Sequence, residues 1–144
     1  MAISKLNIGR TLILVGFLVG WESFYQTFNH IGDPLFTLPE EFGGGTTHAW
    51  YHALRELMGD VATVTAILFV FFAGSRWRVP ATWWICLIAM LGYYSPFWIG
   101  MPFNSALAAP TWDAEIRHII QAALPLSGLF VSRSSFFSDS DPDS

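Results

Sequence analysis

The sequence predicts an all-α protein, an integral membrane four-helix bundle, and three observations support this prediction. The 144-residue chain is 53% hydrophobic and only 12% charged, whereas soluble domains carry about 25% charged residues. Its apolar residues gather in four segments, and each approaches the ~20 residues that a membrane-crossing helix needs. The polar residues lie at one end of each segment, whereas an amphipathic helix has them along one side.

The predicted spans follow the four apolar segments. They run from about Ile8 to Phe28, His48 to Gly74, Ala81 to Gly100 and Asp113 to Ser132. These spans make up one transmembrane domain, residues 1–133. Residues 134–144 form a short acidic, serine-rich tail, and this composition predicts disorder.

Basic residues set the predicted orientation. The four-span topology puts five of them on one side of the membrane: Lys5, Arg10, Arg76, Arg78 and Arg133. Positive charge favours the cytoplasmic side, so both termini are expected to be cytoplasmic. The expected location is a bacterial inner membrane. A single cysteine excludes a disulfide scaffold, and the scattered basic residues make no nucleic-acid-binding patch.

Histidine and acidic residues cluster on the opposite, outer side of this topology. His48, His52 and Glu56 are spaced by four, which places them on one face of a helix. Glu115 and His118 are three apart, and Glu-x-x-His is half of the ligand set of di-iron helix bundles. Imidazole suits iron, copper and zinc. We therefore expect a transition-metal site with His48, His52, His118 and Glu115 as ligands, or alternatively a haem site.

The remaining ionisable residues receive supporting roles. Glu56 and Glu22 are the expected catalytic carboxylates, which would accept protons or orient the ligands. Arg55 and Arg117 would hold the cofactor and balance the carboxylates. Gln121 is expected to face a cavity below His118. The resulting hypothesis is a membrane-embedded oxidoreductase whose site opens to the outer, periplasmic leaflet and takes a lipid-soluble substrate.

Three alternatives stay open at this stage. The cluster could be an ion-pair network, in which Arg55 pairs with Glu22 and Arg117 pairs with Glu56 or Asp60. The chain could be a non-catalytic accessory subunit that packs against other membrane subunits or a second copy of itself. It could also be a proton pathway, with its relay through Glu22, His52, Glu56 and Asp60. The aromatic stretch from Tyr93 to Phe103 fits either a membrane-interface belt or a ligand entrance.

Overall fold

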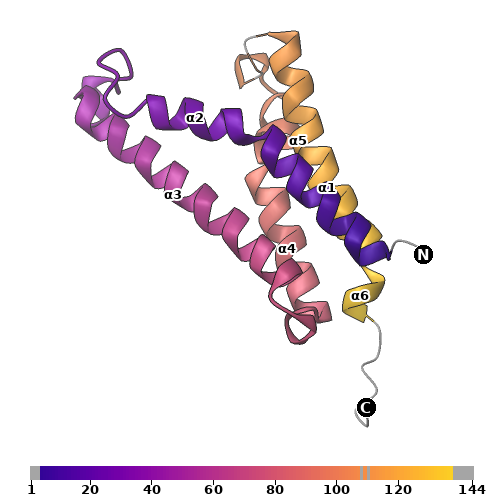
Figure 1. Ribbon diagram of the computed structural model, residues 1–144. Coiled ribbons are helices and arrows are strands. Elements are labelled where there is room, and N and C mark those ends of the chain that lie inside the picture. Colours follow the sequence, from indigo (N-terminus) through magenta and orange to yellow (C-terminus); the bar gives the residue numbers. More distant parts are fainter. Residues whose placement is uncertain (1–3, 108, 110, 138–144) are drawn as a thin grey trace.

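The computed structural model describes residues 4–107, 109 and 111–137, and the regular structure of these residues is helical (Figure 1). Six α-helices are formed: α1 Lys5–Val19, α2 Trp21–Asn29, α3 Gly45–Phe72, α4 Pro80–Tyr93, α5 Trp112–Val131 and α6 Ser134–Phe137. Short helical turns connect them: η1 Glu40–Phe42, η2 Ser75–Trp77, η3 Pro96–Gly100 and η4 Ser105–Leu107.

The prediction of membrane spans is wrong. Among the described residues, no helix combines the length and the apolar character needed to cross a bilayer. The first predicted span breaks at Gly20, which leaves α1 with 15 residues. The third ends at Tyr93, which leaves α4 with 14 residues, and both helices are short of the ~20 that a crossing needs. This finding corrects the expected integral membrane four-helix bundle, its cytoplasmic termini and its bacterial inner-membrane location.

The two longer helices carry charged side chains within their length. α3 has 28 residues, and Arg55, Glu56 and Asp60 lie near its middle. α5 has 20 residues, and its first two turns contain Glu115 and Arg117. The predicted spans included these charged turns because hydropathy was averaged over segments that also contain the apolar turns that follow them.

Close contact between α1 and α5 organises one side of the fold. The two helices pack along their length (Figure 1), and glycines make this approach tight. A Cβ added at Gly9 would lie 2.6 Å from the carbonyl oxygen of Gly128. A Cβ at Gly16 would lie 2.4 Å from the ring of Pro125. Gly16 therefore accommodates the proline that interrupts the backbone hydrogen bonding of α5.

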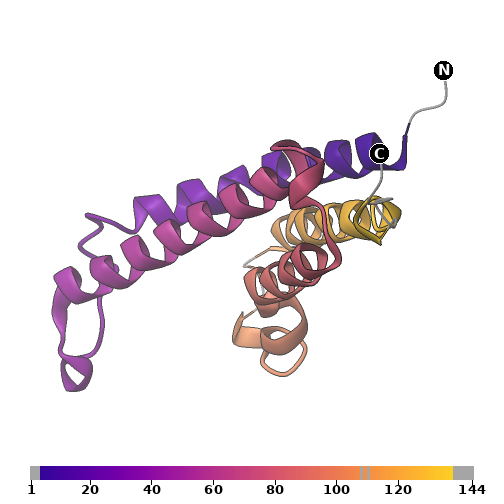
Figure 2. The same cartoon turned by 90° about the horizontal axis from the view of Figure 1, so that it is seen from below.

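Seen from below, the helices form two rows, with α1, α2 and α3 in one and α4 and α5 in the other (Figure 2). The buried core lies where the rows meet, and its members are Ile13, Ile67, Phe71, Trp83, Cys86, Met90, Tyr94, Ala122, Leu129 and Phe136. Two polar contacts border this core near the C-terminal ends of α5 and α3. The Trp83 indole N–H donates to the carbonyl of Leu129 at 3.1 Å, and Arg10 Nε donates to the carbonyl of Phe71 at 2.9 Å.

The expected disordered tail begins at residue 134, where the structure has α6. Phe136 of this short helix is buried against Phe71, with ring centroids 5.3 Å apart. Residues 138–144 lie outside the described residues.

Candidate ligand-binding site

A cavity of about 490 Å³ lies among α2, α3, α5 and the segment that joins α4 to η3. Its polar lining residues are Ser23, Gln26, Thr27, His30, Glu56, Asp60, Tyr93, Tyr94, Ser95, Glu115, His118 and Gln121. Proteins hold small organic ligands in cavities of about 300–1,000 Å³. Of the site residues expected from the sequence, Glu56, Glu115 and His118 line this cavity.

Glu115 is the most buried charged residue of the site. It lies in the first turn of α5, and the Thr111 side chain caps this helix by accepting a hydrogen bond from the Ala114 N–H at 3.4 Å. Glu115 is 6% exposed. Its Oε2 accepts a hydrogen bond from the Ala109 N–H at 2.9 Å, whereas its Oε1 has no partner among the described residues. A buried acceptor left unpaired costs about 1–3 kcal/mol, so this oxygen favours a donor from outside the chain.

Two more carboxylates reach the cavity from α3. Asp60 is half-buried, and desolvation together with the neighbouring Glu56 charge raises its pKa to about 6. Burial and the charges of Asp60 and Glu56 also raise the pKa of the Tyr93 hydroxyl, which therefore stays protonated near neutral pH. The cavity wall thus combines hydrogen-bond acceptors with an acid that titrates near neutrality.

The α5 side of the cavity carries an imidazole and an amide. The His118 ring lies 5.3 Å from that of Phe97, measured between centroids. One turn further along α5, Gln121 Oε1 accepts a hydrogen bond from the Ser23 hydroxyl of α2 at 3.4 Å. Gln121 lines the same cavity as His118, as the sequence analysis expected.

The expected metal ligands are not brought together. His48 and His52 do lie on one face of α3, and their rings stack with centroids 4.8 Å apart. Neither of them lines the cavity that contains Glu115 and His118. Within the described part of the chain, no three His, Cys, Asp or Glu side chains form a group that could hold a metal ion. The predicted metal site is therefore wrong, and the haem alternative stays a prediction.

The predicted ion pairs form with different partners. Arg117 Nε lies 3.1 Å from Glu22 Oε2, and Arg117 Nη1 lies 3.2 Å from Asp113 Oδ2. The sequence had predicted an ion pair of Arg117 with Glu56 or Asp60, and an ion pair of Arg55 with Glu22. Arg55 is exposed on α3 and is not among the residues that line the cavity. The catalytic and cofactor-binding roles expected for Glu22, Glu56, Arg55 and Arg117 stay predictions.

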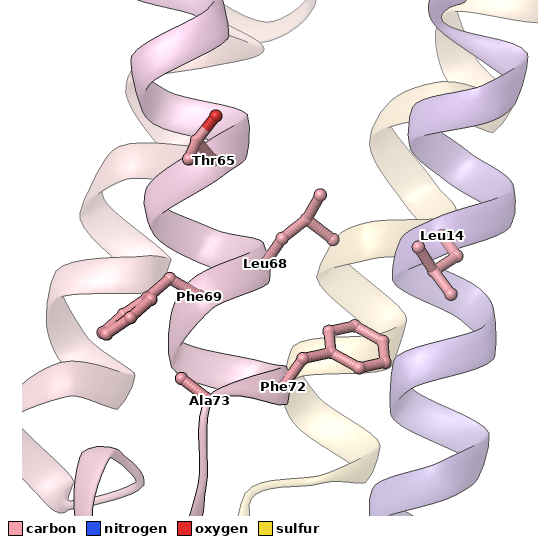
Figure 3. A pocket seen from close by; sticks show the side chains of 6 residues that line it. All are labelled: Leu14, Thr65, Leu68, Phe69, Phe72 and Ala73. Atoms are coloured by element: carbon pink, nitrogen blue, oxygen red, sulfur yellow. The ribbon is translucent and has the colours of Figure 1, made fainter.

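Two other hollows lie between α1 and α3, and they are almost entirely apolar. One, of about 590 Å³, is lined by Leu14, Thr65, Leu68, Phe69, Phe72 and Ala73. Figure 3 shows Leu68 and Phe72 pointing from α3 toward Leu14 on α1, whereas Phe69 points away. The other, of about 580 Å³, continues toward Trp21, Phe28 and Leu57. No Asp, Glu, His, Lys or Arg side chain is among the described lining residues of either hollow.

The aromatic stretch from Tyr93 to Phe103, expected as a membrane-interface belt or a ligand entrance, contributes residues to the cavity wall. Tyr94 is 1% exposed, and Tyr93, Tyr94 and Phe97 all line the cavity. Pro96 directly follows the polar Tyr93-Tyr94-Ser95 group and favours a local break in the helix. α4 ends at Tyr93, and the chain turns there toward α5.

Comparison of the chain with models of known protein families gave no match, and comparisons with curated proteins and with solved structures gave none either. The function is therefore inferred from the chemistry of the site.

Proposed function

We propose that this chain binds a small organic molecule in the cavity among α2, α3, α5 and the end of α4. One observation carries the proposal, namely that the buried carboxylate of Glu115 lines this cavity and has one oxygen without a partner. A ligand that donates a hydrogen bond to Oε1 would remove the cost of that unpaired acceptor.

The remainder of the lining supports this function. Ligand cavities combine apolar and aromatic walls with a few polar groups that fix orientation. Here Tyr94, Phe97 and Leu107 supply apolar surface, while Asp60 and Gln121 supply polar groups. Asp60 titrates near pH 6, so the bound molecule would also lie beside a group able to accept or release a proton.

A screen by ligand-observed NMR tests the proposal. The full chain, kept monodisperse with a non-ionic detergent, is mixed with a fragment set that contains cations, neutral polar compounds and anions. We expect binders whose signals are lost in Glu115→Gln, which replaces the unpaired oxygen by an amide N–H₂. Gln26→Trp, which narrows the cavity from the exposed side of α2, should weaken the same binders.

Glu41→Gln provides the matched control, because Glu41 is exposed in η1 and does not line the cavity. Circular dichroism establishes that each variant is folded. Binders that persist in Glu115→Gln and Gln26→Trp would place binding elsewhere and overturn the proposal, as would a screen without any binder.

A second candidate is the accessory subunit, which exposed apolar side chains favour. Ile85 and Ile88, three residues apart on one face of α4, are 62% and 68% exposed, and clustered side chains of this kind mark protein contacts. Sedimentation should then give a mass above the 16.1 kDa of one chain, and Ile88→Glu should reduce it. A mass of one chain across protein concentrations would argue against this candidate.

The expected oxidoreductase stays a prediction through its haem alternative, since the expected metal ligands do not come together among the described residues.

A further inference from the structure

The cavity has an unbalanced charge. Three carboxylates line it, those of Glu56, Asp60 and Glu115, and no Lys or Arg side chain is among its described lining residues. The described ion pairs join Arg117 to Glu22 and to Asp113, so neither involves these three carboxylates. An unpaired carboxylate in a partly dry site favours a cation.

Burial makes this imbalance matter. Water and salt screen an exposed carboxylate such as that of Glu56, but Glu115 is 6% exposed, and one of its oxygens has no partner among the described residues. The raised pKa of Asp60 has the same origin, since desolvation and the Glu56 charge both disfavour its ionised form. A positive charge within the cavity would stabilise both carboxylates as anions.

The separation of the acidic groups indicates the size of that cation. No three His, Cys, Asp or Glu side chains of the described chain come close enough together to hold a metal ion. The cavity measures about 490 Å³ and offers the rings of Tyr93, Tyr94 and Phe97 as walls. Aromatic faces attract organic ammonium groups through cation–π contacts of about 0.5–2 kcal/mol. A molecule that is both organic and cationic uses every part of this lining.

We infer that the cavity is a site for a small organic ammonium compound, whose charged group pairs with the carboxylate of Glu115 while its apolar part lies against the aromatic wall. This inference rests on the proposed function and names its ligand class. Glu56 and Asp60 supply further negative charge from α3, whereas Glu115 belongs to α5.

Three probes of similar size separate charge from shape: benzylammonium, benzyl alcohol and benzoate. Benzyl alcohol keeps a hydrogen-bond donor but has no charge, and benzoate reverses the charge. Isothermal titration of the full chain at pH 7.5 should give at least about tenfold tighter binding of benzylammonium than of benzyl alcohol, as expected for a hydrogen bond to a charged group. Benzoate should not bind detectably.

Variants locate the effect. Glu115→Gln should weaken benzylammonium by about tenfold and leave benzyl alcohol almost unchanged, whereas the exposed control Glu41→Gln should alter neither. Asp60→Asn provides a second variant if Glu115→Gln fails to fold, because Asp60 is only half-buried. At pH 7.5 this variant should weaken the binding of benzylammonium and leave the binding of benzyl alcohol almost unchanged.

The outcomes distinguish the two proposals. Equal binding of benzylammonium and benzyl alcohol, or tighter binding of benzoate, would overturn the ammonium class and leave a small-molecule site standing. Failure of all three probes and of the whole fragment set would overturn both.

Discussion

Glu56 and Asp60 lie one helical turn apart on α3 and line the same cavity, and the Glu56 charge adds to desolvation in raising the pKa of Asp60 to about 6. The neighbouring negative charge of Glu56 disfavours the ionised form of Asp60. The two carboxylates persist in a part of the fold where an apolar or amide residue would be more stable, which is typical of binding sites.

Replacing Asp60 by Asn should stabilise the protein in a pH-dependent way. The folded chain binds the Asp60 proton more tightly than the unfolded chain does, so stability falls as the pH rises from 3.8 through about 6. Asp60→Asn removes that loss. With solvent screening of the half-exposed group taken into account, the gain at pH 8 should be on the order of 1 kcal/mol, or about 2–4 °C in melting temperature.

Thermal melts at pH 8 and pH 4 measure this effect. At pH 4 the two proteins should melt at nearly the same temperature, because Asp60 is then protonated in the folded state. Glu41→Gln is the exposed control. A gain of equal size at both pH values would show that the charge of Asp60 is not responsible.

Two glycine-to-alanine changes should have opposite signs. At Gly9 a Cβ would lie 2.6 Å from the carbonyl oxygen of Gly128, so Gly9→Ala must push α1 away from α5. We expect a loss of about 1–3 kcal/mol in the free energy of unfolding. At Gly59, an exposed position of α3, an added Cβ would have no neighbouring atom within 4 Å. Gly59→Ala should therefore raise the free energy of unfolding by about 0.5–1 kcal/mol. Denaturant titrations measure both, and a neutral Gly9→Ala would contradict the close packing of α1 on α5.

Cys86 should be unreactive in the folded protein. Its side chain is buried in the core, and burial raises the pKa of its thiol to about 11, so almost no thiolate forms at pH 8. A chromogenic disulfide reagent should modify Cys86 only after guanidinium unfolds the chain. Rapid modification before unfolding would show that α4 does not pack as described.

The Arg117–Glu22 ion pair should contribute little to stability. Both side chains are about half-exposed, at 43% and 52%, and such pairs contribute about 0.2–1 kcal/mol, decreasing with salt. A double-mutant cycle of Arg117→Gln and Glu22→Gln measures the coupling free energy. A coupling well above this range at high salt would restore the ion-pair network as the reason for the cluster.

Sequence reasoning identified part of the site and misjudged the helices around it. The i,i+4 spacing of His48 and His52 correctly placed them on one face of α3, and Gln121 was correctly expected beside His118. The break at Gly20 was missed, because glycine interrupts an apolar run without changing its hydropathy. Glycine is sterically required at position 20, because a Cβ there would lie 2.8 Å from Gln121 Oε1 of α5.

The spacing of residues within one helix could not predict which side chains of α3 and α5 lie in the same site. Whether His52 meets His118 depends on how α3 is placed against α5, and the sequence gives no distance between them. In the structure Glu56 and Asp60 face the α5 residues of the cavity, whereas His48 and His52 lie earlier on α3 and outside it. The sequence left the aromatic stretch from Tyr93 to Phe103 open between a membrane-interface belt and a ligand entrance, because spacing along the chain does not show that Tyr94 is buried.

The most direct test of the central claim is a map of where a ligand binds. Isotope-labelled chain is titrated with benzylammonium, and the shifts of assigned backbone amides are followed to saturation. We predict the largest shifts at cavity residues, among them Tyr94, Glu115 and His118, and no shift at His48. Shifts centred instead on Leu14 and Phe72, in the apolar hollow of Figure 3, would contradict the account.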